Sequence, residues 1–157
     1  MSFKAQAITY DFFLASAIFL VLILYLFIQW YRIEVGMYED EIRKKMFSEA
    51  FKVSEIVLRE GSPKYWNPQT VKEIGLSNNN QINETKLNYL TSMGYSKFES
   101  LANLKFFTNI SIEKLNGEKI FEFGPSVSLT PKELVKVKRF GILRSKPVKI
   151  IVYTWRV

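Results

Sequence analysis

A run of apolar residues near the N-terminus constrains this chain more than any other feature. From Phe12 to Tyr31 the sequence carries no charged residue, and only Ser16 and Gln29 are strongly polar. As a helix that rises ~1.5 Å per residue, such a run crosses a hydrocarbon layer ~30 Å thick. Aromatic residues stand at both ends of the run, where the interfaces of a bilayer favour them. We therefore expect one membrane-spanning helix at the N-terminus.

The residues around this run do not fit a cleaved secretory signal. Such signals have an apolar core of roughly 7–15 residues, followed by a cleavage site with small residues. Here the charged segment Arg32-Ile33-Glu34 follows directly, whereas the small residues Ala5 and Ala7 precede the run. Cleavage near these alanines would leave the hydrophobic helix on the mature protein. An uncleaved signal anchor is the alternative.

The start of the chain resembles the prepilin-type leader, specifically the class III signal peptide of archaeal type IV pilin-like proteins. The matching residues are Lys4-Ala5-Gln6, the acid Asp11 and the uninterrupted apolar run. The resemblance implies that a prepilin peptidase cuts between Ala5 and Gln6, so that residues 1–5 form a leader. The chain departs from the family in its single basic leader residue and in the acid at the sixth mature position, where many pilins have it at the fifth.

Asp11 has two interpretations. A carboxylate at the edge of a hydrocarbon layer is costly unless it has a partner. After cleavage, the new α-amine of Gln6, in the same chain or in a neighbour, would be such a partner. The resemblance then implies that Asp11 sets the register of subunits that assemble through residues 6–31. Alternatively, Asp11 marks the cytoplasmic interface and stays hydrated.

The charges beside the apolar run do not decide its orientation, because Lys and Arg residues flank both ends. The resemblance places the N-terminus in the cytoplasm and residues 32–157 outside, as a single-pass protein of the cell membrane or a cell-surface filament. Two sequons, Asn83-Glu84-Thr85 and Asn109-Ile110-Ser111, are compatible with an external location. Asn83 and Asn109 are therefore candidate glycosylation sites.

The membrane helix is expected to continue through residues 32–60. Apolar residues recur there on one helical face, and most charges lie off this face. Gly36 is the one expected bend or break, and Gly61 with Pro63 predicts the end of the helix. In a pilin this second half packs on the protein's own head. The predicted apolar stripe consists of Ile42, Met46, Ala50, Val53 and Val57.

Residues 61–157 predict a small head of the α+β class. After Leu104 the apolar residues alternate, which indicates an antiparallel sheet of about four strands packed on the long helix. Asn116-Gly117 is typical of a two-residue hairpin turn. The expected strands are 106–112, 119–123, 134–143 and 148–155, with a helix over 129–136 as an alternative for the start of the third.

Three short helices are expected before the strands. Asn67 and Asn83 are candidate N-caps of the first two helices, and Ser96-Lys97-Phe98-Glu99 has the pattern of a capping box. The expected ranges are 67–75, 84–93 and 96–102, with a polar loop over 77–80. Spaced residues over most of the head also resemble secreted archaeal pilin-like proteins, a likeness that implies fold and location but no chemistry. They are Gly61-Ser62-Pro63, Trp66, Val71, Ile74-Gly75-Leu76, Lys86-Leu87, Leu90, Val135, Val137, Lys138-Arg139-Phe140 and the final apolar strand that ends in Trp155.

The composition argues against catalysis. The chain has no His and no Cys, which removes the commonest general base, thiol nucleophiles and most transition-metal ligands. No phosphate-binding glycine loop or Gly-x-Ser-x-Gly motif occurs. We therefore expect no catalytic residue, cofactor or metal site. The expected function is that of a minor pilin or pilin-like component of a type IV filament or surface assembly. Its expected partners are the prepilin peptidase, other pilin-like subunits and the lipid bilayer.

A membrane-anchored binding protein is the alternative function. The net charge is +7, and basic residues are dense near the C-terminus. Such clusters attract polyanions, so the head would bind cell wall, another surface or DNA, with nucleic acid the less favoured partner. The same residues also fit a solvent-exposed face of a strand. The candidate polyanion contacts are Lys136, Lys138, Arg139, Arg144 and Lys146.

Overall fold

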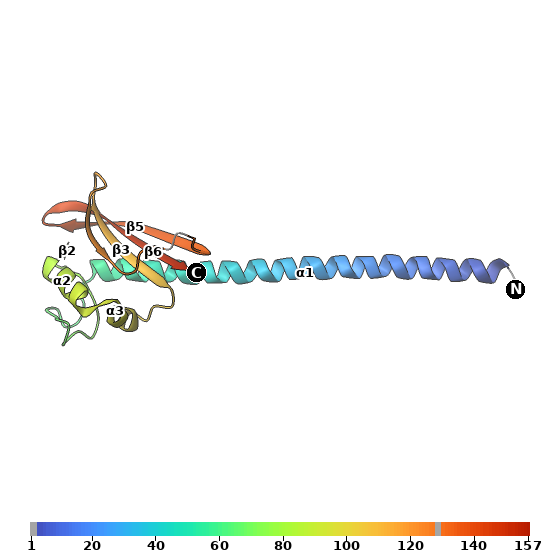
Figure 1. Cartoon of the computed structure of the whole chain (residues 1–157), viewed down its shortest axis with the longest axis horizontal. Coiled ribbons are helices and arrows are strands. Elements are labelled where there is room, and N and C mark those ends of the chain that lie inside the picture. The colour runs from blue at the N-terminus through green and yellow to red at the C-terminus, as the bar shows by residue number, and fades with distance from the viewer. Residues whose placement is uncertain (1–2, 128–129) are drawn as a thin grey trace. The chain divides into compact units, whose positions relative to one another are not determined.

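The fold is α+β: a long N-terminal helix is followed by a head of short helices and a mixed sheet (Figure 1). The computed structural model describes residues 3–127 and 130–157, and the side chains of residues 3–9 also lie outside the described part. The chain divides into two compact units, Met1–Ile42 and Arg43–Val157. The second unit is called the head below.

Helix α1 (Phe3–Leu58) is uninterrupted, so the break expected at Gly36 does not occur. A glycine inside a helix costs only about 1 kcal/mol relative to alanine, which the flanking helix formers tolerate. A Cβ at Gly36 would meet no atom within 4 Å, so no neighbour requires a bend there. The helix ends just before Gly61, whose φ of +79° is the left-handed conformation expected of a terminating glycine.

Two short helices follow, α2 (Glu84–Met93) and α3 (Tyr95–Ala102). Helix α2 has the predicted bounds, because the side-chain oxygen of Asn83 accepts a hydrogen bond from the Lys86 N–H at 3.2 Å. The predicted capping box of α3 is wrong. Gly94 occupies the N-cap position without a side-chain hydrogen bond, and Ser96 lies inside the helix.

The helix predicted over residues 67–75 does not form. The side-chain oxygen of Asn67 accepts from the N–H groups of Gln69 and Thr70, as an N-cap would, but it caps only one turn. The chain then becomes extended, and the Glu73 N–H donates to the Ser62 carbonyl at 3.0 Å. Pairing with Ser62 has therefore overridden the local helix signal.

The sheet has six strands in the order β1-β2-β5-β6-β3-β4. The four predicted strands are present, and neighbours among them pair antiparallel. Residues 133–143 form a strand, so the helical alternative for this segment is wrong where the structure describes it; Leu129 lies outside the described residues. The bounds are β1 (Ser77–Asn78), β2 (Gln81–Ile82), β3 (Phe107–Lys114), β4 (Lys119–Phe123), β5 (Glu133–Leu143) and β6 (Lys146–Arg156).

Two hairpins differ from expectation. The segment predicted as a polar loop, 77–80, contains β1 and the turn residues Asn79 and Asn80, which join β1 to β2 with φ of +48° and +63°. Two successive left-handed residues are the requirement of a type I′ turn. The turn at Asn116-Gly117 is longer than two residues, since Lys114 is the last residue of β3 and Lys119 the first of β4.

The C-terminal half of α1 lies at the centre of the head's core. In Figure 1 the sheet lies on one side of it and α3 on the other. Met46, Ala50, Val53 and Val57 of the predicted stripe are completely buried. The last three belong to one cluster with residues of α2, α3 and the sheet, among them Leu90, Phe98 and Ile150. Full burial of a valine-sized or larger side chain contributes about 1.5–3 kcal/mol, so this stripe is a main source of the head's stability.

A close approach of two glycines fixes the chain after α1, and it yields the first testable prediction. A Cβ at Gly75 would lie well inside van der Waals contact of the Gly61 backbone nitrogen. We expect Gly75→Ala to lower the free energy of unfolding of the head by roughly 2–3 kcal/mol, because backbone atoms must move apart. The measurement is urea unfolding followed by the near-UV signal of the buried Trp66 and Trp155.

Gly36→Ala is the matched control, because a Cβ there meets nothing within 4 Å. This variant should leave the unfolding of the head unchanged. Equal stability of Gly75→Ala and the wild type would contradict the close approach.

Candidate functional site

One helix near the N-terminus is long and apolar enough to cross a membrane. Large apolar side chains are exposed along its apolar run, among them Phe12 at 68% at one end and Tyr31 at 67% at the other. Apolar surface costs about 25 cal/mol per Å² in water, so a contiguous surface of this kind needs a bilayer or protein neighbours.

The predicted leader and assembly residues lie at the start of this helix. Ala5 and Gln6 have helical backbone, and their side chains lie outside the described residues. Asp11 is exposed on the same helix, directly before the apolar run. Gln6 and Asp11 are five residues apart, whereas side chains face each other on a helix at separations of three or four.

The five candidate polyanion contacts do not gather in one patch. Lys136 and Lys138 are exposed on the outer face of β5, where the Lys136 ammonium lies 4.8 Å from the centre of the Tyr153 ring. Arg139 points to the opposite face, towards α1. Its guanidinium lies 5.1 Å from the centre of the Phe51 ring and 3.7 Å from the Glu55 carboxylate.

Arg144 and Lys146 lie near the turn between β5 and β6. Arg144 binds both carboxylate oxygens of Glu84 in α2, with 2.9 Å between Nη2 and Oε2. The bidentate pair holds the pKa of the Glu84 carboxyl below its usual value. Lys146 is exposed. Arg139 and Arg144 already have acidic partners. The structure therefore supports a polyanion site at these five residues less strongly than the sequence suggested.

The two sequons lie in different environments. Asn109 is 2% exposed, and its side-chain nitrogen donates to the Pro125 carbonyl at 3.0 Å. This nitrogen is the atom that would carry a glycan, so it is not accessible in the folded head. Asn83 is half-buried and uses its side-chain oxygen, rather than its nitrogen, to cap α2.

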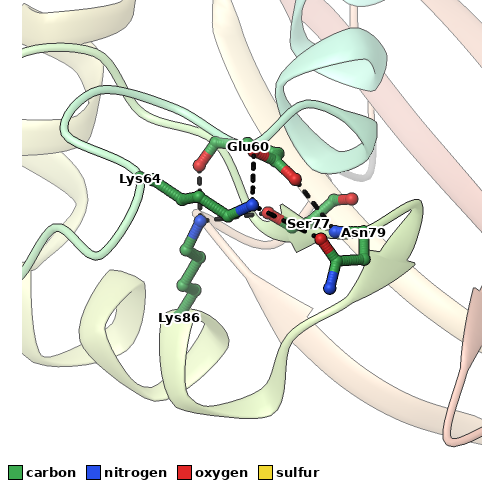
Figure 2. A network of polar contacts seen from close by, with 5 residues as sticks. All are labelled: Glu60, Lys64, Ser77, Asn79 and Lys86. Carbon is green, nitrogen blue, oxygen red and sulfur yellow. Dashed lines mark hydrogen bonds and ion pairs between the residues drawn. The ribbon is translucent and has the colours of Figure 1, made fainter.

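Lys86 is a buried lysine that the sequence analysis missed. It is 3% exposed, and its ammonium donates to the main-chain carbonyls of Glu60 and of Ser77, the latter at 3.0 Å. It thereby joins the segment after α1, strand β1 and helix α2 (Figure 2). Burial lowers the pKa of Lys86, and the nearby Glu60 carboxylate opposes this shift.

The carboxylate of Glu60 holds the β1–β2 turn from the same side. It accepts the Asn79 N–H at 2.9 Å and lies 3.4 Å from the Lys64 ammonium, as Figure 2 shows. The Asn79 N–H, helped by Lys64, lowers the pKa of Glu60 against a smaller opposing effect of burial. The network therefore clamps three segments together. The signal for it in the sequence was a lysine on the apolar face of α2, beside Leu87 and one turn before Leu90.

Comparisons with known protein families, curated proteins and solved structures find no match to this chain. Within residues 3–127 and 130–157, no three acidic side chains gather as a metal site would require. The function must therefore be inferred from the long helix and from the contacts within the head.

The clamp yields a prediction with a defined pH dependence. We expect Lys86→Met to lower the free energy of unfolding by about 1–3 kcal/mol at pH 7, because two carbonyls lose a donor. The folded pKa of Lys86 lies below the unfolded value near 10.5. As the pH rises towards 10.5, the unfolded chain retains the extra proton, so the wild type gains stability while its neutral amine still donates to both carbonyls. The difference in unfolding free energy between wild type and variant should therefore widen with pH in urea titrations.

Lys64→Met is the control for this experiment. Lys64 belongs to the same network but is partly exposed, and its ion pair with Glu60 is a surface pair. Such pairs contribute at most about 1 kcal/mol, so this variant should differ little from the wild type. A difference for Lys86→Met that stays constant from pH 7 to 10 would contradict the buried ammonium.

Proposed function

We propose that this chain is a single-span, non-enzymatic pilin-like subunit, a minor pilin or a related component of a type IV filament or surface assembly. In this proposal residues 1–5 are a prepilin-type leader and residues 6–31 the membrane helix. The head lies outside the cell membrane of an archaeal cell. The support comes from the leader-like sequence together with the two environments of α1.

The observation that carries the proposal is the change of environment along one helix. Side chains from Tyr10 to Tyr38 present large apolar exposure, whereas Met46 to Val57 supply buried residues to the core of the head. In a soluble protein the apolar side chains of residues 10–38 would have nothing to cover them. A signal peptide would not share its helix with the core of the mature domain. A subunit held by its helix in a bilayer, and later in a bundle of like helices, accounts for both halves.

The position of Asp11 supports assembly between chains. After cleavage at Ala5–Gln6, the new α-amine would lie ~7.5 Å along the helix axis from Asp11, at ~1.5 Å per residue. A separation of five residues places the two groups on different sides of the helix. The amine of a neighbouring subunit is therefore the better partner for Asp11 than the amine of its own chain. Such a pair would stagger adjacent helices by a fixed amount.

Leader processing is the first test of the proposal. We expect protein isolated from native membranes to begin at Gln6, as measured by N-terminal sequencing and intact mass. Ala5→Leu should block processing, because the peptidase must accommodate the side chain before the scissile bond. Ala7→Leu adds the same bulk beyond that bond and should still be processed. Mature protein that begins at Met1 or Ser2 in cells with an active prepilin peptidase would contradict the proposal.

Assembly is the second test. We expect Asp11→Ala to be processed and inserted, because the apolar run is intact, but to be depleted at least tenfold from purified filaments or complexes. Glu34→Ala is the matched control, since it removes the first acid on the other side of the span. The measurement is the ratio of subunit in the assembled fraction to subunit in the membrane. Equal incorporation of both variants would leave Asp11 without a role in assembly.

A further inference from the structure

Strand β5 has an open side over most of its length. On one side β6 pairs with it from Glu133 to Leu143. On the other side Leu143 alone pairs, with Ile82 of β2. Among the described residues, none pairs with positions 133–142 on this second side. Strand β2 therefore fills only one end of the position beside β5, and the remaining edge presents unpaired backbone donors and acceptors.

The open edge runs along one flank of α1. Within the head, Arg43 lies 3.6 Å from Glu133 at one end. The guanidinium of Arg139 lies over the Phe51 ring further along. Strand β5 and helix α1 therefore run in the same direction along this flank.

Two aromatic side chains of α1 remain exposed on this flank. Phe47 is 55% and Phe51 42% exposed, and their rings stack with centres 6.4 Å apart. Where β2 is present, the situation differs. Ile82 is buried, and a Cβ at Gly141 would lie 3.1 Å from Ile82 and 3.3 Å from Leu58. The sheet thus covers the helix beside β2 and leaves it uncovered where β2 ends.

An extended segment that continues the line of β2 would pair with the open edge of β5 and cover Phe47 and Phe51. Its backbone would pair with β5, and alternate side chains would point inwards over Phe47 and Phe51. The side chains between them would point outwards beside Lys136 and Lys138, which are exposed on the outer face. The complementary sequence is therefore apolar on the inner face and acidic on the outer face beside Lys136 and Lys138, whereas Leu134, Phe140 and Ile142 of the same outer face are exposed apolar residues.

Charge also argues against a second copy of the chain as the occupant of this edge. If two β5 edges paired antiparallel about Val137, Lys136 of one copy would lie opposite Lys138 of the other. Like charges directly opposite each other destabilise a strand pair. We propose that the open edge of β5 binds an extended segment of another protein, with alternating apolar and acidic residues, by strand addition. This surface is independent of the proposed pilin-like function.

The test uses the full chain in nanodiscs of zwitterionic lipid and a fluorescent peptide of alternating Val and Glu, eight residues long. We expect saturable binding by fluorescence anisotropy. A peptide with Lys in place of Glu should bind at least tenfold more weakly. Two N-methylated peptides are compared, one methylated at all Val nitrogens and one at all Glu nitrogens. Only one of these two sets of N–H groups faces β5, so one of the two peptides should bind at least tenfold more weakly.

Variants of the chain locate the binding surface. The double substitution Lys136→Glu and Lys138→Glu, and separately Phe47→Ser, should each weaken binding at least tenfold. Lys72→Glu reverses one charge at an exposed residue outside this edge and should leave binding unchanged. Absence of saturable binding, or binding insensitive to both N-methylated peptides, would overturn the proposal. So would a disulfide between Lys136→Cys in one copy and Lys138→Cys in another, because the edge would then be occupied by a second copy.

Discussion

The packing of the C-terminal half of α1 against the sheet is the constraint on which the rest of the head depends. Ala50, Val53 and Val57 belong to one buried cluster with residues of α2, α3 and the sheet. The same helix continues, without a break, into a segment whose large apolar side chains are exposed. Two successive segments of one continuous helix thus supply residues to the head's hydrophobic core and present an exposed apolar surface long enough to cross a membrane. A change in the helix's apolar stripe would disturb the cluster that it shares with α2, α3 and the sheet.

Much of this architecture could be predicted because strong local signals agreed with the tertiary structure. The apolar stripe from Met46 to Val57, the Asn83 cap of α2 and the alternation in β5 and β6 each specify one conformation. Local signals misled where a distant backbone competed with them. Asn67 caps a single turn as its neighbours suggest, but the Ser62 carbonyl draws Glu73 into an extended pairing. Ser96 resembles a cap, yet Gly94 is the N-cap of α3 and the helix begins at Tyr95.

The missed features follow from the same reasoning. Asn79-Asn80 was available as a type I′ signal, because asparagine tolerates the left-handed conformation better than other non-glycine residues. Its flanking strands are two residues each, too short to show alternation. The role of Lys86 was not predictable in full, since the carbonyls it binds belong to residues 60 and 77. The separation of Arg139 from Lys138 follows from strand alternation alone and could have been foreseen.

The hydrogen bond between Asn109 and Pro125 has a consequence for the order of events in the life of the chain. It fastens the segment after β4 to the face of β3, and it uses the nitrogen that a glycosyltransferase would need. Folding and glycosylation at this sequon therefore exclude each other. A sugar at Asn109 would therefore show that the modifying enzyme acted on the molecule before its sheet had formed. Because Asn109 is buried in the folded head, such a molecule would have to displace the segment after β4 to accommodate the sugar.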